Sequence, residues 1–441
     1  MDHKTLGKIF QEIIVELSEM GPTTLDDLEK KVRDVLGSLG ECMMEWKLED
    51  WDTEVRKEVC SECASKLENR KRESQIATVV ADVTYTRYRS SCPNCGKVEY
   101  PLDVMLGLRS LQRLSWLMEE LSILCGASWK YGEAEYILEK FLGRRVSHET
   151  IFNKTSEVGK AASMEVEGVQ IKELEDDKKL QGEYFDNMEV WEQPAERIYM
   201  DMDGVQINSR DGTKRMEGKV AIVWSERELV KTDTYSLTDK RAMGTFTDPE
   251  RFYWDVTGEL YKRSGGKMDA VDSLVRGDGA PFIRGFRENY APKSRYILDH
   301  YHLCEKVKQR ISGSVYEDKE RRREVREAII EYLDTDDVDG ALEYIQKQMK
   351  RFRKKSKLYH LKKLSDYIQR NRAGIWYKEA RQKGISIGAG SVDKAGDILI
   401  CRRMKLRGMR WSRVGADGVL AIRILTYNRE WDDFWSRYKA A

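Results

Sequence analysis

Residues 197–208 read RIYMDMDGVQIN, and this stretch decides the expected fold because its Ile, Tyr, Met and Val content is typical of a β-strand. Two similar segments follow at 218–224 (GKVAIVW) and 228–237 (ELVKTDTYSL). The turns between the three segments are polar or contain glycine, so an antiparallel meander is the simplest arrangement.

The sequence after this meander alternates helix and strand patterns. Residues 249–263 (PERFYWDVTGELYKR) have helical spacing, and 270–283 (AVDSLVRGDGAPFI) form an apolar run that ends in a turn. Residues 294–302 (SRYILDHYH) read as a short strand that runs into a helix. Strands, helix, strand, helix and strand in this order predict a mixed α/β sheet within a multi-domain α/β chain.

Acidic residues mark the ends of the predicted strands. Asp201 and Asp203 close the first strand, Asp278 follows the fourth, and Asp299 ends the fifth. Residues i and i+2 of a strand share a face, so Asp201 and Asp203 are expected to point together toward Asp278. Neighbouring carboxylates repel, so this cluster is either a site for divalent cations, as in phosphodiester chemistry, or an exposed rim. Asp-Gly pairs also mark turns that carry no chemistry.

Four of the eight cysteines are paired by their spacing. Cys60 and Cys63 form one CxxC, and Cys92 and Cys95 form another, with 28 residues between the pairs. The first residues show no secretory signal pattern, which argues against a disulfide framework and favours metal or redox chemistry. Two CxxC turns complete the four-thiolate shell of a structural Zn²⁺ site, so the spacing predicts a zinc ribbon; a redox CxxC is the alternative. Residues 76–91, between the pairs, have the composition of a strand.

The remaining cysteines and one His-rich string have weaker patterns. Cys42, Cys125, Cys304 and Cys401 lack paired neighbours and are expected to be core thiols. The cluster Asp299, His300, His302 and Cys304 is either a metal site or a satisfied structural network.

The N-terminal part of the chain has helical spacing. A helix start is expected at GPTTLDDLEK (21–30), where Thr24 can cap a helix with an acidic first turn. Residues 129–160 read as two helices broken at Gly143, which is the layout of a helix-turn-helix. Two interpretations remain: the second helix reads DNA, or the two helices form a packed helical hairpin without that role. The side chains that would contact DNA are Ser147, His148, Thr150 and Asn153.

The charged residues balance overall but are segregated along the chain. Lys and Arg number 77 and Asp and Glu 76, giving a net charge of +1. Residues 164–196 carry eleven acidic groups and three lysines, whereas 345–372 carry eleven basic groups and only Asp366 as an acid. Basic runs of this kind bind phosphates or form solvated helix faces. No apolar stretch approaches the ~18 residues that a membrane span needs, so an integral membrane protein is not expected.

Five strings resemble motifs of a known family. They are DMDGVQI (201–207), GDGAPFI (277–283), ILDHYHLCEK (297–306), GAGSVDKA (388–395) and RRMKLRGMRWS (402–412). They occur in the same order as in the DDE transposases of bacterial and archaeal insertion sequences, the ISLre/ISKra/ISH-like group. The resemblance covers most of the chain and extends to PLDVMLGL (101–108) and WDDFW (431–435). It implies an RNase H-like catalytic domain with a helical insertion between the second and third acidic residues.

The resemblance also implies the site. It assigns the catalytic carboxylates that hold Mg²⁺ or Mn²⁺ to Asp203, Asp278 and Asp393. The third position departs from the family, because aspartate stands where glutamate is expected and retracts the carboxylate by one methylene. Asp397, one helical turn later, is a substitute candidate, and an acid in a helix first turn is the plain alternative for Asp393. The DNA-contacting residues of the basic tail would be Arg402, Arg403, Lys405, Arg407 and Arg410, and Trp411 would either stack on a base or belong to the core.

Six segments follow from these patterns. They are an N-terminal helical region (1–56), a zinc ribbon (57–105), a helical, helix-turn-helix-like DNA-binding region (106–165), the first part of an RNase H-like core (190–302), a helical insertion (303–384) and the C-terminal part of the core (385–441).

The expected function is that of a DNA transposase that cleaves and joins the strands of an insertion sequence, in transposition and DNA recombination, with structural Zn²⁺ and catalytic Mg²⁺ or Mn²⁺. Expected partners are double-stranded DNA and further copies of the chain, in the nucleoid of a prokaryotic cytoplasm. The alternatives are a non-catalytic DNA-binding relic or regulator, and an RNase H-fold nuclease without strand transfer.

Overall fold

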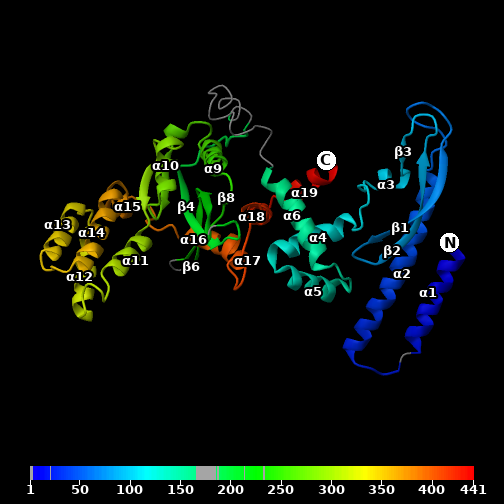
Figure 1. The fold of residues 1–441 in the computed structure, drawn as a ribbon, viewed down its shortest axis with the longest axis horizontal. Coiled ribbons are helices and arrows are strands. Elements are labelled where there is room, and N and C mark those ends of the chain that lie inside the picture. The colour runs from blue at the N-terminus through cyan, green and yellow to red at the C-terminus, as the bar shows by residue number, and fades with distance from the viewer. Residues whose placement is uncertain (1–2, 20, 165–184, 186–187, 213, 232–233) are drawn as a thin grey trace. The chain divides into compact units, whose positions relative to one another are not determined.

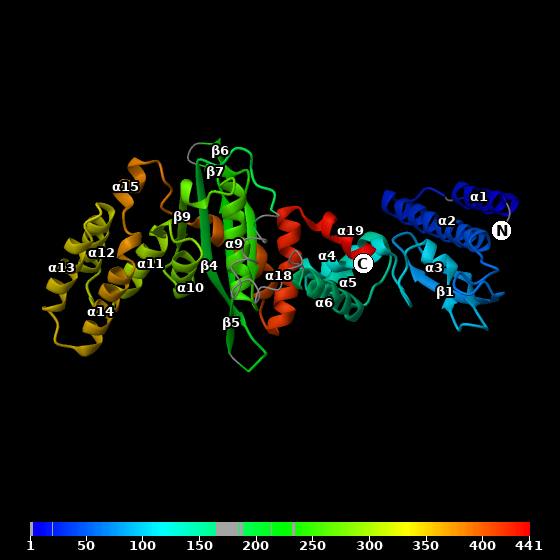
Figure 2. The same cartoon turned by 90° about the horizontal axis from the view of Figure 1, so that it is seen from above.

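A computed structural model describes residues 3–19, 21–164, 185, 188–212, 214–231 and 234–441 (Figures 1 and 2). The chain divides into two compact units, one of Met1–Val158 with Asp432–Ala441 and one of Gly159–Trp431. Most of the acidic stretch 164–196 lies outside the described residues. Among the residues described, no helix combines the length and apolar character that crossing a membrane requires.

The first unit begins with two helices and a small sheet. The elements are α1 (His3–Ser18), α2 (Leu25–Glu54), β1 (Glu68–Ala77), β2 (Asp82–Ser91) and β3 (Val98–Glu99). The Thr24 hydroxyl accepts a hydrogen bond from the Asp27 amide and caps α2, as the sequence predicts. The three strands pair antiparallel in the order β1-β2-β3. The strand expected between the cysteine pairs is present as β2, which runs directly into Cys92. It is shorter than 76–91, because the chain turns at 78–81 and residues 76–77 belong to β1.

The rest of the first unit is helical. Its elements are α3 (Pro101–Met105), α4 (Trp116–Ser128), α5 (Tyr131–Leu142), α6 (His148–Met164) and α19 (Trp431–Ala440). The part of α6 up to Val158 belongs to this unit. Gly143, with φ of 65°, ends α5 in the left-handed region that favours glycine. The break predicted at Gly143 is therefore present.

A five-stranded mixed sheet forms the centre of the second unit. Its strands are β4 (Arg197–Asn208), β5 (Arg215–Trp224), β8 (Arg241–Thr245), β9 (Asp272–Gly277) and β10 (Arg295–Leu298). The spatial order is β10-β9-β4-β5-β8; β4, β5 and β8 are antiparallel, and β9 runs parallel to both β4 and β10. The mixed α/β class predicted from the sequence is confirmed.

Two predictions about this sheet were wrong. Residues 228–237 do not form the third meander strand: β6 (Arg227–Lys231) and β7 (Thr234–Leu237) pair with each other in a separate two-stranded sheet. The third strand is β8, which escaped notice because RAMGT is short and contains two small residues. In addition, Asp201 and Asp203 lie within β4, because the strand continues to Asn208.

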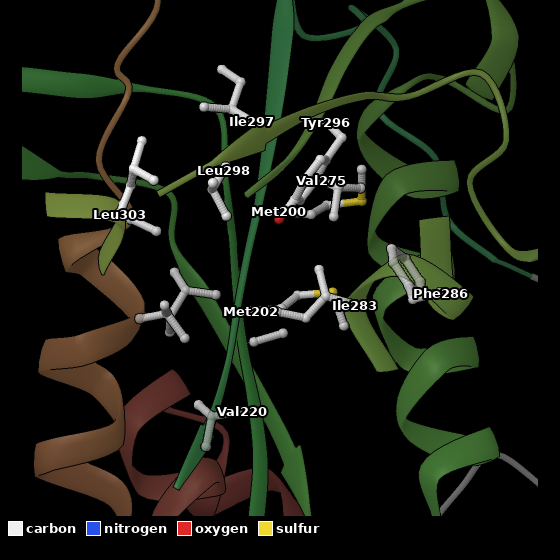
Figure 3. Packing of buried hydrophobic residues seen from close by; sticks show 14 of the residues in the cluster. Met200, Met202, Val220, Val275, Ile283, Phe286, Tyr296, Ile297, Leu298 and Leu303 are labelled. Carbon is white, nitrogen blue, oxygen red and sulfur yellow. The ribbon is translucent and has the colours of Figure 1, made fainter. Parts of the chain in front are cut away.

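Helices cover both faces of the sheet. They are α9 (Pro249–Arg263), α10 (Pro281–Asn289), α16 (Gly390–Gly396) and α18 (Arg413–Asn428), with the short helices η1 (Met268–Ala270), η3 (Asp397–Cys401) and α17 (Arg402–Met404). Met200 and Met202 pack with Ile283 and Phe286 of α10 on one face (Figure 3). The alternate residues of β4 face α16, which packs on β4 and β5. This alternation directs Asp201 and Asp203 toward α16.

Helices fill the chain between β10 and α16. They are α11 (His300–Arg310), α12 (Lys319–Asp334), α13 (Val338–Met349), α14 (Lys355–Arg370), η2 (Arg372–Gly374) and α15 (Tyr377–Gln382). Their buried residues, including Ile329, Ile345 and Leu364, continue the core of the sheet. The helical region that the sequence predicts between Asp278 and Asp393 is therefore present, and it shares one core with the sheet.

Candidate functional site

Asp203 is half-buried and lies on β4 opposite Val220. Burial, and to a smaller extent the negative charges of Asp278 and Asp393, raise its pKa to about 6. The Gly204 amide and the positive charge of His302 act in the opposite direction. The three acids therefore share one electrostatic environment although they come from distant parts of the chain.

Asp278 directly follows β9, the strand that pairs with β4. Its Oδ1 accepts a hydrogen bond from the Ala280 amide at 2.8 Å, which shapes the turn. Gly279 has φ of 83°, and a Cβ there would lie 2.4 Å from Asn371 Oδ1, so only glycine fits. The Tyr367 hydroxyl donates to the Asp278 carbonyl at 2.9 Å. The backbone of this acid is thus held from both sides.

Asp393 lies in the first turn of α16 and is exposed. Although the residue is exposed, partial desolvation of its carboxyl group raises its pKa; the charge of His302 lowers this pKa, and the charges of Asp299, Asp201 and Asp278 raise it. Among the described residues, the oxygens of the three acids do not all lie within 4.8 Å of one another. The charges of the acids still act on one another, since Asp278 and Asp393 both raise the pKa of Asp203.

His302 joins the acids, and its role follows from Asp299. Asp299 is 1% exposed and accepts hydrogen bonds from the His302 amide at 2.8 Å and from the Ala389 amide, just before α16. Its pairing with His302 Nδ1, at 3.2 Å, raises the histidine pKa to about 9, and the charges of Asp393 and Asp203 contribute. An imidazolium therefore faces the acids.

The string from Asp299 to Cys304 is a hydrogen-bonded network. His300 pairs through Nε2 with Asp334 at 2.9 Å, and Cys304 Sγ lies 3.8 Å from its ring nitrogens. Among the described residues these four side chains do not form a metal-ligand group. Sequence reasoning had no signal for the approach of His302 to Asp203 and Asp393.

Asp201 does not join Asp203 and Asp278, and this expectation was wrong. Asp201 is fully buried, and its carboxylate accepts two hydrogen bonds from Arg276, at 2.6 and 2.7 Å. Trp224 Nε1 donates to it at 2.8 Å, and the Ser391 hydroxyl donates as well. Arg276, on β9, neutralises the charge that was expected to bind a cation. The network instead ties the sheet to the start of α16.

The four paired cysteines converge in the first unit. The ligand atoms of Cys60, Cys63, Cys92 and Cys95 all lie within 4.8 Å of one another, and Sγ of Cys63 is 3.4 Å from that of Cys92. The two turns match: the Ala64 amide donates to the Cys60 carbonyl, and the Gly96 amide to the Cys92 carbonyl, both at 3.0 Å. Hydrogen bonds from Ser65, followed by one from Asn94, lower the pKa of Cys63 to about 5. Four thiols in two matched turns fit a tetrahedral Zn²⁺ site.

The other cysteines lie outside this cluster. Cys42, Cys125, Cys304 and Cys401 are partly buried, and burial raises the pKa of each thiol.

The predicted DNA-reading residues lie at the start of α6. Ser147 and Thr150 share a hydrogen bond of 2.9 Å between their hydroxyls, and Ser147 Oγ accepts from the Thr150 amide, so both serve the helix start. His148 donates its amide to Glu135 of α5 at 3.0 Å, and its Nδ1 lies 2.9 Å from the same carboxylate. Asn153 is exposed. Glu135 therefore fixes the angle between the two helices.

The basic tail divides into exposed and buried residues. Arg402 is exposed and pairs with Asp397 at 2.8 Å, so Asp397 has a cationic partner. Lys405, Arg407 and Arg410 are exposed. Arg403 is 1% exposed and lies over the Trp411 ring at 4.9 Å. Arg403 is therefore not an exposed DNA contact as expected, and Trp411 belongs to the core.

Comparison with known proteins places these sites within one family. A family model described as "Uncharacterised protein family (UPF0236)" matches residues 21–431, a range that contains both cysteine pairs and all three acids. A relative from Streptococcus gallolyticus, "UPF0236 protein in vanSb 3'region", is 24% identical over 360 residues, which are 79% of this chain and 71% of the relative.

Proposed function

We propose that this chain, which belongs to the UPF0236 family, is a DDE-type transposase that cleaves DNA strands and transfers them with divalent metal ions. The observation that carries the proposal is that Asp203, Asp278 and Asp393 lie close enough for their charges to interact, although they come from β4, the end of β9 and α16. The charges of Asp278 and Asp393 raise the pKa of Asp203, and the charge of Asp278 raises that of Asp393.

The sheet supports the proposal. Three antiparallel strands followed by two strands parallel to the first, in the order β10-β9-β4-β5-β8, are the arrangement expected of an RNase H-like domain. The first acid lies on the central strand, and the second follows the adjacent parallel strand. The helical insertion of the proposed family corresponds to α11–α15.

The donor set fits hard divalent cations, because carboxylate oxygens are the ligands that Mg²⁺ and Mn²⁺ prefer. Asp203, Asp278 and Asp393 would hold them, and bound cations would activate a water or 3′-hydroxyl and stabilise the leaving oxygen. The raised pKa of Asp203 expresses the cost of charging this carboxylate in a buried position and beside two like charges, a cost that bound cations would relieve.

The residues around the acids have separate tasks. Asp299 orients the His302 ring, and the imidazolium is placed to attract the negatively charged phosphodiester toward the carboxylates. The Asp201–Arg276 pair, through Ser391, holds the helix that carries Asp393. No protein nucleophile is required, because the attacking group is a hydroxyl of water or DNA.

The first unit would bind the ends of the element. Its four cysteines would hold a structural Zn²⁺, and α5 and α6 would present Asn153 and neighbouring polar residues to double-stranded DNA. The exposed Arg402, Lys405, Arg407 and Arg410 would contact phosphates. Transposition of this kind would take place in the prokaryotic nucleoid with more than one copy of the chain.

One observation favours a second candidate, a DNA-binding regulator without chemistry. Asp393 is exposed and one methylene shorter than the glutamate of the resembled family, so its carboxylate reaches less far toward Asp203. A nuclease without strand transfer has the same site and differs only in the nucleophile used in the joining step.

The deciding experiment is cleavage and joining of a labelled duplex carrying the ends of the element, with Mg²⁺ or Mn²⁺. Wild type, Asp278→Ala and Asp393→Glu are compared, and Asp366→Asn, an exposed acid on α14, is the control. The proposal requires cleavage and joined products with wild type and control, and none with Asp278→Ala. Cleavage without joining would identify a nuclease. A silent wild type with an active Asp393→Glu would identify the regulator.

A further inference from the structure

A cleft of about 460 Å³ opens beside the acids, between α11 and α14. Asp278, Gly279, Ala280 and His302 form the end nearest the acids. The remaining lining residues are polar or charged: Glu305, Lys306, Gln309, Arg310, Lys363, Tyr367 and Arg370. Tyr367 contributes the one large ring among these residues, and the predominance of charged groups argues against a small apolar ligand.

The cleft has a net positive charge, because four Lys and Arg side chains outnumber its two carboxylates. Lys306 and Arg310 lie one helical turn apart on α11, and Lys363 and Arg370 lie two turns apart on α14. In the part of the chain that the structure describes, none of these four forms an ion pair, whereas the neighbouring Glu305 pairs with Lys308 at 3.2 Å. Four cations without carboxylate partners face one space, which favours a polyanionic ligand.

The cleft is coupled to the acid site through Tyr367. Its hydroxyl donates to the Asp278 carbonyl at 2.9 Å, and the Lys306 ammonium lies 5.7 Å from the centre of its ring. Tyr367 therefore links Lys306 of the cleft to the backbone of Asp278. A phosphate bound by Lys306 would lie close to this carboxylate.

We propose that this cleft binds the phosphate backbone of a single DNA strand and so sets the register of the strand at Asp278. Lys306 and Arg310 are about 6 Å apart along their helix, and Lys363 and Arg370 about 10 Å apart, at about 1.5 Å per residue. Successive nucleotides of a stacked strand rise about 3.4 Å, and their phosphates are farther apart than this rise, so each row can contact two neighbouring phosphates. The identification of the ligand as DNA rests on the proposed function. The expectation that the ligand carries phosphates rests on the charges of the cleft alone.

The test measures binding without Mg²⁺, so that it does not depend on cleavage. A fluorescein-labelled single-stranded DNA of arbitrary sequence is titrated with the full chain at several salt concentrations. The Lys363→Gln/Arg370→Gln variant removes two cleft charges. The matched control is Lys355→Gln/Lys362→Gln, which removes two exposed charges from the same helix outside the cleft. Thermal unfolding checks that both variants fold.

We expect the slope of log K against log salt to fall by about 1.4 in the cleft variant, or 0.7 for each lost contact. The control should change the slope by less than half as much. Equal changes in both variants, or no change in the cleft variant, would overturn the proposal. Displacement of the oligonucleotide by inorganic tripolyphosphate at the same phosphate concentration would also overturn it, because the ligand would then be a small phosphate.

The two proposals can fail separately. If the wild type does not cut DNA, but the salt dependence of DNA binding falls in the cleft variant and not in the control, the transposase proposal fails and the cleft proposal stands. If the wild type cuts and joins DNA, but the cleft variant binds DNA as the wild type does, only the cleft proposal fails.

Discussion

The guanidinium of Arg276 donates two hydrogen bonds to the carboxylate of Asp201, at 2.6 and 2.7 Å, with both side chains at most 1% exposed. A third guanidinium nitrogen donates to the Ser386 carbonyl at 2.8 Å, and Ser391 donates to Asp201. The pair therefore connects two sheet strands to the segment that leads into Asp393. Its function is to position that segment, because neither charge is free to bind a ligand.

Removal of one partner of this pair should destabilise the second unit strongly. Asp201→Ala leaves Arg276 buried without a counter-charge, and such losses cost about 3–5 kcal/mol. The double variant Asp201→Leu/Arg276→Met should recover much of this loss, because no buried charge remains. Urea unfolding of the three proteins measures the difference. If the single and double variants lose equal free energy of unfolding, the unpaired charge of Arg276 is not the cause of the loss.

The ionised carboxylate of Asp203 should lower the free energy of unfolding when no metal ion is bound. Its folded pKa of about 6 exceeds the ordinary value of 3.8, so folding becomes less favourable as pH rises from about 4 to about 6. Asp203→Asn removes this penalty and should raise the free energy of unfolding at pH 7 by at most about 3 kcal/mol, at about 1.4 kcal/mol per pKa unit. At pH 3.5 the variant and the wild type should be similar. Chemical unfolding at both pH values, without Mg²⁺, measures the effect.

The same variant reports on metal binding. For a site with Kd near 1 mM, 10 mM Mg²⁺ should stabilise the wild type by about 1.4 kcal/mol. The stabilisation should vanish in Asp203→Asn and persist in Asp366→Asn, whose acid is exposed on α14. Equal stabilisation of all three proteins by Mg²⁺ would mean that the ion binds elsewhere.

The sequence predicts the sheet better than the site. The strand pattern at 197–208 and the two-residue alternation correctly place Asp201 and Asp203 on one face. Alternation cannot show that Arg276, on the neighbouring strand, neutralises one of them, because that depends on the register of Asp201 opposite Arg276. Only the family resemblance pointed to Asp393, because six helices separate it from the last strand of the sheet. The cysteine spacing, by contrast, led directly to the cluster, because each CxxC turn is a local structure.

The four-cysteine cluster should bind one Zn²⁺ per chain. Zinc binding is coupled to folding in sites of this kind, so Cys92→Ser should lose both the ion and the structure of the β1–β3 sheet. Cys42→Ser should retain the ion, because Cys42 lies outside the cluster. Metal content by mass spectrometry of the purified proteins gives the answer. A wild type with no zinc after expression in zinc-replete medium would contradict the assignment.

Glu135 should make the helical pair α5 and α6 sensitive to acid. Hydrogen bonds from Arg145 and then His148 lower its pKa from 4.5 to about 2, so the ionised carboxylate is favoured in the folded state. The lowered pKa means that its stabilisation is complete above about pH 4.5 and is lost as the pH falls toward 2. Glu135→Gln should therefore destabilise the first unit at pH 6 and have a progressively smaller effect as the solution is acidified.

The comparison with a neighbouring glutamate isolates this contribution. Glu139→Gln removes an exposed carboxylate from the same helix and should leave the pH dependence of unfolding close to that of the wild type. Acid-induced loss of zinc affects all three proteins equally, so it cancels in the differences between them. A stability difference between wild type and Glu135→Gln that stays constant from pH 6 to pH 3 would show that the carboxylate charge does not hold the two helices together.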